Sequence, residues 1–262
     1  MSTSNRWGDL AARVISGAVL AALGLGAVWA GGYVFIWFVS IVTGLIVWEL
    51  TRMLRDDGGL PVQMGVLAGV AAFAAIYFKA GFAVPILLLP AIVGYLRLPD
   101  QRKVFVPFVL FILLASFGMM SVRNEFGVVW MLWLVLVVAA TDIAGYFAGR
   151  ILGGPKFWPS ISPKKTWAGT SAGWVSAAAV GAIFMGVTGS GLWLILLSVA
   201  SSFASQLGDI AESAVKRRAG IKDSSNLIPG HGGLFDRFDG MLAASVLVLV
   251  VIQLTGFPPS PV

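Results

Sequence analysis

The sequence has no cysteine, a single histidine and few charged residues. Charged residues make up only 11% of the 262 positions, against about 25% in an ordinary soluble protein. Without cysteine there is no disulfide framework, no thiolate nucleophile and no thiolate zinc site. With 58% hydrophobic residues, the chain cannot cover a soluble fold with polar side chains. These shortages exclude a soluble enzyme and a disordered chain, and they leave the redox compartment open.

Long apolar runs fill most of the chain. A helix needs about 20 mainly apolar residues to cross roughly 30 Å of hydrocarbon. The runs lack the alternation of β-strands, and a lipid-exposed sheet would have to close into a barrel. We therefore predict an all-α polytopic membrane protein with about nine transmembrane helices. The predicted helices cover Leu10–Ala30, Tyr33–Leu50, Val62–Phe78, Gly81–Leu96, Val104–Val122, Phe126–Phe147, Thr166–Val187, Leu192–Val215 and Phe238–Leu254.

The basic residues predict an orientation for these helices. Of the 18 Lys and Arg residues, 16 fall in alternate connecting segments, and only Lys79 and Arg123 fall in the others. Short cytoplasmic loops carry an excess of Lys and Arg. The asymmetry predicts a cytoplasmic N-terminus and a C-terminus on the outside. The net charge of +6 is thereby explained without a nucleic-acid partner.

The two halves of the chain differ in polar content. Residues 1–125 form predicted membrane helices that act as a scaffold and face lipid. Residues 126–262 form further membrane helices, with cytoplasmic loops that carry a predicted catalytic site. In the first half, Glu49 ends the second apolar run near Arg52, and we interpret it as an ion pair at the membrane interface with no role in function.

Asp142 lies well inside the sixth apolar run. An ionisable group at that depth is costly, so it should face the interior of the bundle or a watery cavity. The alternative to a functional role is a structural ion pair with a basic residue of a neighbouring segment.

The segment from Gly149 to Thr166 is rich in glycine and proline and ends in two lysines. Ser162 followed by Pro163 is typical of a helix start. It would place Lys164 and Lys165 in the first turn, where the helix dipole disfavours cations unless an anion binds there. The sequence thus predicts an anion site at a helix N-terminus, and the alternative is a basic flank that only orients the helix.

A polar stripe occupies the last two turns of the eighth run. Spacings of three and four place Gln206, Asp209, Ser213 and Lys216 on one helical face, with Glu212 beside them. Such a stripe must line a cavity or a protein contact.

Further acidic residues follow a basic, glycine-rich loop. Asp236 and Asp239 are three residues apart at the predicted start of the ninth helix, so both project on one side of its first turn. With Asp209 and Asp142 they supply hard oxygen ligands that suit Mg²⁺. Basic residues and glycines beside them are the groups that hold a polyphosphate. The residues predict metal-dependent phosphoryl or nucleotidyl transfer to a hydrophobic, membrane-resident substrate.

The same residues resemble the signature of the phosphatidate cytidylyltransferase family, also called CDP-diacylglycerol synthases. The resemblance covers more than a dozen specified identities over about 27 residues, and weaker blocks extend it over essentially the whole chain. The blocks are Ser213 to Arg217, Lys222-Asp223 and Ile228 to Asp239, with Gln206 to Glu212, Thr141-Asp142, Gly149-Arg150, Ser162 to Thr166, Arg13 and Trp48 to Leu50 as further support.

The resemblance implies that CTP and phosphatidate react to give CDP-diacylglycerol and pyrophosphate in phospholipid biosynthesis. It implies dependence on Mg²⁺, with either a second cation or lysines neutralising further charge. It also implies a multi-pass protein of a bacterial-type inner membrane, an active site on the cytoplasmic side, and a homodimer.

The resemblance assigns roles to residues of this sequence. The implied catalytic residues are Asp209, Asp236, Lys222, Asp223, His231 and Arg237. The implied substrate-binding residues are Lys164, Lys165, Thr166, Ser213, Lys216, Arg217, Gly232 and Gly233. The implied metal ligands are Asp209, Asp236 and Asp239, with Asp142 as a further ligand or a neighbour of the ligands.

One position departs from the family pattern. The lysine block usually continues with a glutamate, and this sequence has Ala168 there, so the carboxylate is dispensable or replaced by another group. Two other functions stay open: a CTP-dependent enzyme acting on another lipid, such as a polyprenol kinase that releases CDP, and an ion-coupled transporter.

Overall fold

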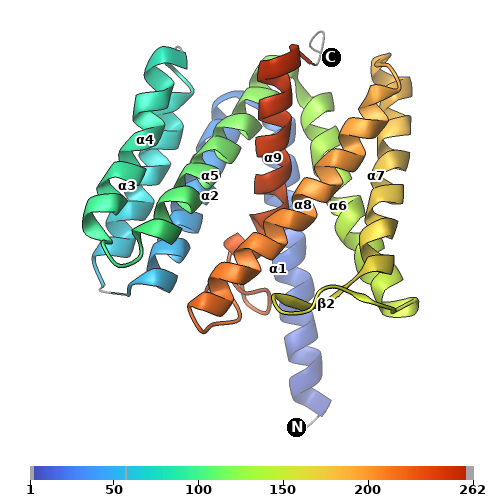
Figure 1. Cartoon of the computed structure of the whole chain (residues 1–262), viewed down its shortest axis with the longest axis horizontal. Coiled ribbons are helices and arrows are strands. Elements are labelled where there is room, and N and C mark those ends of the chain that lie inside the picture. Colours follow the sequence, from blue (N-terminus) through green and yellow to red (C-terminus); the bar gives the residue numbers. More distant parts are fainter. Residues whose placement is uncertain (1–2, 57, 79, 258–262) are drawn as a thin grey trace. The chain divides into compact units, whose positions relative to one another are not determined.

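The computed structural model describes residues 3–56, 58–78 and 80–257. Within these residues it consists of nine α-helices, one short π-helical turn and a two-stranded hairpin (Figure 1). The elements are α1 (Thr3–Ala30), α2 (Gly32–Leu54), α3 (Leu60–Ala75), α4 (Ala80–Arg97), α5 (Arg102–Ser121), η1 (Val122–Phe126), α6 (Val128–Ile151), β1 (Lys156–Trp158), β2 (Ser162–Thr166), α7 (Trp167–Thr188), α8 (Trp193–Arg218) and α9 (Phe235–Thr255).

The predicted all-α class is confirmed, and each predicted apolar run coincides with one helix. Seven helices are long and apolar enough to cross a membrane, whereas α3 and α4 offer shorter apolar stretches. The 16 residues of α3 span about 24 Å at 1.5 Å per residue, less than the roughly 30 Å of hydrocarbon. The chain is a multi-pass membrane protein by these criteria. Nine crossings and the orientation stay predictions, and Lys79 and the C-terminal residues 258–262 lie outside the described residues.

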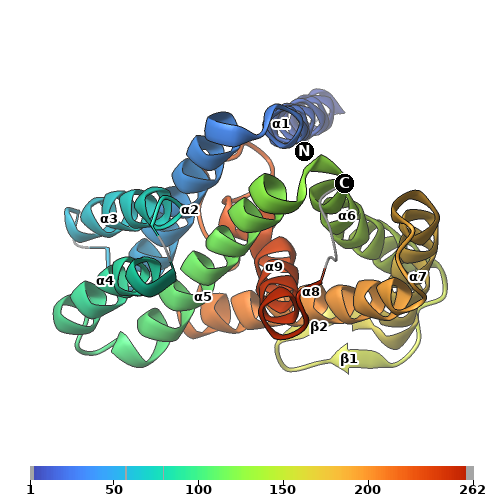
Figure 2. The same ribbon diagram turned by 90° about the horizontal axis from the view of Figure 1, so that it is seen from above.

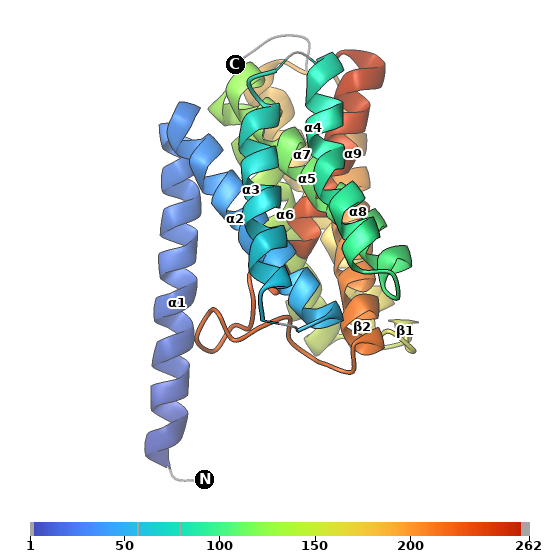
Figure 3. The ribbon, with the colours of Figure 1, turned by 90° about the vertical axis from the view of Figure 1, so that its left-hand side faces the viewer.

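The chain divides into two compact units. The first comprises residues 1–120 and 218–238, and the second comprises residues 121–217 and 239–262. The loop between α8 and α9, residues 219–234, thus belongs with the N-terminal helices. In Figure 3 this loop passes beside α1 and α2.

In the first unit, α2, α3 and α4 lie side by side (Figure 2). Helix α2 contacts α3 closely because Gly44 faces Gly65: a Cβ added at Gly65 would lie 2.7 Å from the carbonyl oxygen of Gly44. Helix α2 also contacts α5, where Thr43 Oγ1 and Ser116 Oγ are 2.6 Å apart. Small residues at such crossings let helix backbones approach, and they fix the position of α2.

In the second unit, small and hydroxyl side chains join α6, α7, α8 and α9. A Cβ added at Gly169 of α7 would lie 2.6 Å from the carbonyl oxygen of Gly145 in α6. Thr141 of α6 donates a hydrogen bond to Ser202 of α8 at 2.8 Å. Gly208 of α8 packs directly against the backbone of α9 at Asp239. These contacts hold the polar end of α8 against the start of α9.

The prediction that a helix starts at Ser162 and Pro163 is wrong. Residues Ser162–Thr166 form strand β2, which pairs with β1 in an antiparallel hairpin. The helix begins at Trp167, and Thr166 caps it by accepting a hydrogen bond from the Gly169 amide at 3.1 Å. Pairing with β1 keeps the segment extended, so Lys164 and Lys165 lie on a strand and not in the first turn of a helix.

Candidate active site

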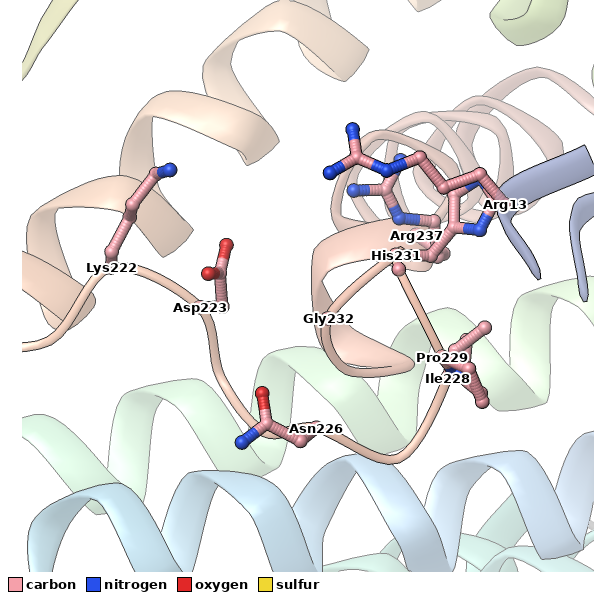
Figure 4. Close-up of a pocket in the computed structure, with 10 residues that line it drawn as sticks. Arg13, Lys222, Asp223, Asn226, Ile228, Pro229, His231, Gly232 and Arg237 are labelled. Atoms are coloured by element: carbon pink, nitrogen blue, oxygen red, sulfur yellow. The ribbon is translucent and has the colours of Figure 1, made fainter. Parts of the chain in front are cut away.

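The loop 219–234 and the first turn of α9 form a polar pocket of about 340 Å³ in the first unit (Figure 4). We call it the basic pocket. It is lined by Arg13, Lys222, Asp223, Asn226, Ile228, Pro229, Gly230, His231, Gly232 and Arg237. In Figure 4, Lys222 and Asp223 lie on one side and Arg13 and Arg237 on the other. Three cations against one carboxylate make this pocket suited to phosphate groups.

A tight turn shapes the part of the loop that carries His231. The Ile228 amide donates to the Gly232 carbonyl at 2.8 Å, and the His231 amide donates to the Ile228 carbonyl at 2.9 Å. Gly232 has a φ of 83°, and a Cβ there would lie 2.8 Å from Asp236 Oδ2. A Cβ at Gly233 would collide with Ser224 and Glu49. The conformation of the loop therefore requires glycine at both positions. Their predicted contact with substrate stays a prediction.

Asp236 organises this loop from the first turn of α9. Its Oδ2 accepts three hydrogen bonds, from the Ser224 amide at 2.9 Å, the Ser224 hydroxyl at 2.8 Å and the Gly233 amide at 2.8 Å. A carboxylate in the first turn also has a favourable interaction with the helix dipole. Asp236 thus ties both ends of the loop to α9. Its assignment as a metal ligand stays a prediction.

Glu49 of α2 also fixes the loop 219–234 by hydrogen bonds. Its carboxylate is fully buried, and it accepts hydrogen bonds from the Ser225 hydroxyl at 2.6 Å, the Phe235 amide at 2.7 Å and the Leu234 amide at 2.9 Å. The interpretation of Glu49 as an interface ion pair with Arg52 is wrong, since Arg52 pairs with Asp56 at 3.5 Å. A buried carboxylate needs such donors because burial removes its hydration, and the loop supplies them.

Helix α1 completes the wall around His231. Ser16 Oγ lies 2.8 Å from His231 Nδ1 and 2.9 Å from the carbonyl oxygen of Pro229. A hydroxyl has one hydrogen, and the Pro229 carbonyl can only accept it. This geometry therefore favours donation from Nδ1–H to Ser16, which leaves Nε2 as the acceptor of a neutral ring. His231 is thereby oriented within the basic pocket, while its catalytic role stays a prediction.

Three carboxylates converge in the second unit, and we call them the acidic cluster. Asp209 and Glu212 come from α8 and Asp239 comes from α9, and one oxygen of each lies within 4.8 Å of the others. Glu212 is only 1% exposed. The predicted ligands Asp209 and Asp239 are brought together, and Glu212 joins them. Carboxylates this close repel one another, so the cluster suits a divalent cation.

Two lysines border the acidic cluster. Lys165 Nζ lies 2.6 Å from Asp209 Oδ2 and 3.1 Å from the Gln206 carbonyl oxygen. Lys216 pairs with Glu212 one turn along α8, and Ser213 donates to Asp209 Oδ1 at 3.3 Å. Within the predicted polar stripe on α8, Asp209 and Ser213 contact one another. The Gln206 side chain instead bonds to Trp174 and to the Thr170 carbonyl of α7. Three carboxylates against two ammonium groups leave one negative charge in excess.

Four other predicted residues belong neither to the acidic cluster nor to the lining of the basic pocket. Asp142 is exposed on α6 and is not one of the three converging carboxylates among the described residues. Lys164 is exposed on β2, and Arg217 is exposed in the last turn of α8. Thr166 is buried and serves as the cap of α7. The predicted metal ligation by Asp142 stays a prediction, and so do the predicted substrate contacts of Lys164, Thr166 and Arg217.

Sequence reasoning missed three residues. Arg13 lines the basic pocket, whereas in the sequence it supports the orientation and the family resemblance and is given no role in the site. Glu49 is interpreted from the sequence as an interface residue. Glu212 was placed beside the α8 stripe without a role. Its spacing of three from Asp209 was the available signal, whereas the partners of Glu49 lie more than 170 positions away and leave no local pattern.

The chain is similar to several curated bacterial proteins. A curated protein from Brucella suis named phosphatidate cytidylyltransferase is 33% identical over 97% of each chain. One of the same name from Mycobacterium bovis is 33% identical over 93% of this chain and 90% of its own. One from Bacillus subtilis is 41% identical over 47% of each chain.

The match to the family as a whole covers nearly all of the structure. It extends over residues 11–255, which include α1 with Arg13, the whole of the basic pocket and all three members of the acidic cluster. The chain therefore belongs to the cytidylyltransferase family.

Proposed function

We propose that this protein transfers CMP from CTP to phosphatidate, giving CDP-diacylglycerol and pyrophosphate. The relatives named phosphatidate cytidylyltransferase support this reaction. The structural observation that supports it is the basic pocket, which Arg13, Lys222 and Arg237 line together with the glycines of the loop 219–234. Such a pocket suits anions, and both substrates are anionic.

The chemistry requires little acid–base catalysis. The nucleophile is an oxygen of the lipid phosphomonoester, which is largely ionised near neutral pH because its second pKa is about 6. This oxygen forms a bond to the α-phosphorus of CTP, and the bond from that phosphorus to the bridging oxygen breaks. The electron pair leaves with pyrophosphate. Catalysis then consists of aligning two anions and neutralising the charge that develops.

We assign charge neutralisation to two sets of residues. Lys222, Arg13 and Arg237 bind phosphate oxygens in the basic pocket. The acidic cluster suits Mg²⁺, because three carboxylates offer hard oxygen ligands and carry excess negative charge. When bound, Mg²⁺ neutralises phosphate charge and orients the substrate. We keep Asp236 and Asp142 as proposed further ligands, and a second cation as an alternative to the lysines.

The location of the protein is part of the same proposal. We place it in a bacterial-type inner membrane, with nine crossings, a cytoplasmic N-terminus and the active site on the cytoplasmic side. The distribution of Lys and Arg along the chain supports this orientation. We also propose a homodimer, on the family resemblance alone, which light scattering of the detergent-solubilised protein tests.

Product analysis tests the function. Purified protein is incubated with CTP labelled in the cytidine, Mg²⁺ and phosphatidate, and the products are identified. Lipid-linked CMP with pyrophosphate supports the proposal. Release of CDP with a phosphorylated lipid alcohol would point to a kinase. An absence of CTP turnover would contradict both the cytidylyltransferase and the kinase. It would favour a transporter, which is assayed as flux in vesicles.

Asp236→Asn tests the site at residue level. The amide keeps the size of the carboxylate but lacks its charge and places an NH₂ group opposite hydrogen-bond donors. We expect turnover to fall by about 10²-fold or more, while the variant still inserts into the membrane. Near-normal turnover would refute the role of Asp236 in the site.

A further inference from the structure

An apolar groove runs along the lipid-facing side of α2 and α3 in the first unit. Its volume is about 580 Å³. The lining consists of Trp37, Ser40, Ile41, Gly44, Leu45, Trp48, Val62, Gly65, Val66, Gly69, Val70, Phe73 and Leu227. Apart from Ser40, the lining residues are apolar or glycine.

The groove exists because glycines form its floor. Gly44, Gly65 and Gly69 bring the two helix backbones together, since a Cβ at Gly69 would lie 3.0 Å from the Ser40 carbonyl oxygen. Larger side chains then stand up on either side. Ile41 is 58% exposed on α2 and Val66 is 62% exposed on α3, so the groove is open to the surface of the protein.

The length of the groove matches one leaflet of a bilayer. It runs from Trp37, which packs on Phe73 with ring centroids 4.4 Å apart, to Trp48 and Val62. Trp48 follows Trp37 by eleven positions on α2, which corresponds to about 17 Å of helix at 1.5 Å per residue. Half of a hydrocarbon core of roughly 30 Å is about 15 Å. A single acyl chain fits this depth.

One end of the groove meets the loop of the basic pocket. Leu227 lines the groove, and its chain neighbours Asn226 and Ile228 line the basic pocket. The loop is fixed at this end of α2 because Ser225 donates a 2.6 Å hydrogen bond to Glu49, which follows Trp48. Figure 4 shows Asn226 on the stretch of loop that passes over the helices. A polar, cationic pocket and an apolar groove thus share one three-residue wall.

We propose that the groove binds an acyl chain of the phosphatidate substrate while its phosphate occupies the basic pocket. This inference rests on the proposed function for the identity of the lipid. The pairing of a cationic pocket with a leaflet-deep apolar channel is complementary to an anionic phospholipid, whose phosphate and chains are joined by a short glycerol. An ordinary bilayer lipid would fill the groove without needing the cations.

Photocrosslinking tests the position of the chain. The full-length protein is placed in phosphatidylcholine vesicles that contain phosphatidate with a diazirine midway along one acyl chain. Irradiation should label α2 and α3 between Trp37 and Phe73. Excess unlabelled phosphatidate should reduce the labelling several-fold, and excess phosphatidylcholine should not. Labels on other helices, crosslinks between two protein copies, or equal competition by both lipids would overturn the inference.

A pair of exposed valines gives a kinetic test. Val66→Trp fills the groove, whereas Val84→Trp adds the same bulk at a residue of α4 that is 55% exposed and outside the groove. We expect Val66→Trp to raise the KM for long-chain phosphatidate about tenfold. The KM for CTP, and the KM for dihexanoyl phosphatidate, should stay near the wild-type values. Equal KM values for the two variants would overturn the inference.

Failure of the inference and failure of the proposed function are distinguishable. Suppose that the wild-type protein turns over CTP with phosphatidate, but the label is not found on α2 and α3 and Val66→Trp does not change the KM. Only the inference about the groove then fails. If the wild-type protein does not turn over CTP, the proposed function fails. Labelling that phosphatidate still displaces from the groove would then support a phosphatidate-binding site in a protein with another activity.

Discussion

Two buried glutamates show how differently the two units use negative charge. Glu49 and Glu212 are almost equally inaccessible, at 0% and 1% exposure. Glu49 is surrounded by hydroxyl and amide donors of the loop 219–234. Glu212 faces two other carboxylates and the ammonium group of Lys216. The hydrogen-bond acceptors of Glu49 are thus satisfied by groups of the protein, whereas the carboxylates around Glu212 carry excess negative charge that suits a cation.

This difference indicates a structural role for Glu49 and a role in the acidic cluster for Glu212. A carboxylate satisfied by backbone amides fixes the conformation of a segment, because moving it would leave several buried groups without partners. Carboxylates that face one another store repulsion that a bound cation relieves. We therefore expect substitutions at the two places to fail in different ways.

The largest effect should come from the acidic cluster. Asp239→Asn removes one charge from the proposed metal site, and we expect activity to fall about 10³-fold. Electron paramagnetic resonance with Mn²⁺ as the probe should show weaker binding to the variant. Asp56→Asn, which removes one charge from an exposed ion pair with Arg52 outside the site, serves as the control and should retain most activity. Normal Mn²⁺ affinity in Asp239→Asn would exclude Asp239 as a ligand.

Glu49→Gln and Glu212→Gln test the comparison directly. Glu49→Gln places an amide NH₂ group against donors, at a cost of about 1–3 kcal/mol, and should lower activity by about 10²-fold through disorder of the loop. Its melting temperature should fall but should still rise on addition of Mg²⁺, as mass action requires for a ligand of the folded state.

For Glu212→Gln the pattern should reverse. The variant should lose the Mg²⁺-dependent rise in melting temperature, because one of the three proposed ligands is gone. If Glu49→Gln lost the response to Mg²⁺ and Glu212→Gln kept it, the division into scaffold and metal site would be wrong.

A smaller effect is expected in the basic pocket. Lys222→Ala removes one cation from a partly open site, and we expect a 10- to 100-fold loss in kcat/KM, or about 1.4–3 kcal/mol. The loss should appear mainly in KM. The exposed Lys103 at the start of α5 provides a matched control, and an equal effect of Lys103→Ala would mean that net charge alone is responsible.

The smallest effect is expected at α1. Ser16→Ala removes the hydroxyl that contacts His231 and Pro229, and a single hydrogen bond contributes about 0.5–1.5 kcal/mol. Activity should fall roughly two- to tenfold, and Ser16→Thr should restore it. Wild-type activity of Ser16→Ala at every substrate concentration would contradict a role of Ser16 in orienting His231.

Local patterns predicted much of this protein. Each of the nine predicted apolar runs coincides with a helix in the part of the chain that the structure describes, because run length and composition are properties of the segment itself. The stripe of Gln206, Asp209, Ser213 and Lys216 followed from helical periodicity, and within it Asp209 and Ser213 contact one another. The hairpin at Ser162–Thr166 was missed, since serine followed by proline is equally compatible with a helix start and with an extended strand.

Partners distant in the sequence could not be predicted. Arg13 and His231 line one pocket although more than 200 positions separate them along the chain, as the contact of Ser16 with His231 illustrates. The role of Glu49 could not be predicted for the same reason. Its nearest neighbour of opposite charge in the sequence is Arg52, whereas its partners are the Ser225 hydroxyl and the Leu234 and Phe235 amides. Backbone donors have no signature in composition or charge.

The burial of Glu49 also constrains how the protein is made. Helix α2 enters the membrane early in synthesis with a carboxylate at its end, and the donors for that carboxylate lie 175 to 186 residues later. At the usual rate of about 5–20 residues per second, the ribosome needs roughly 10–40 seconds to supply them. Until then the first unit holds an unsatisfied acid, which hydration or protonation must stabilise. The N-terminal helices therefore cannot reach their final packing until the chain has been translated as far as Phe235, because the loop 219–234 completes the fold of these first helices.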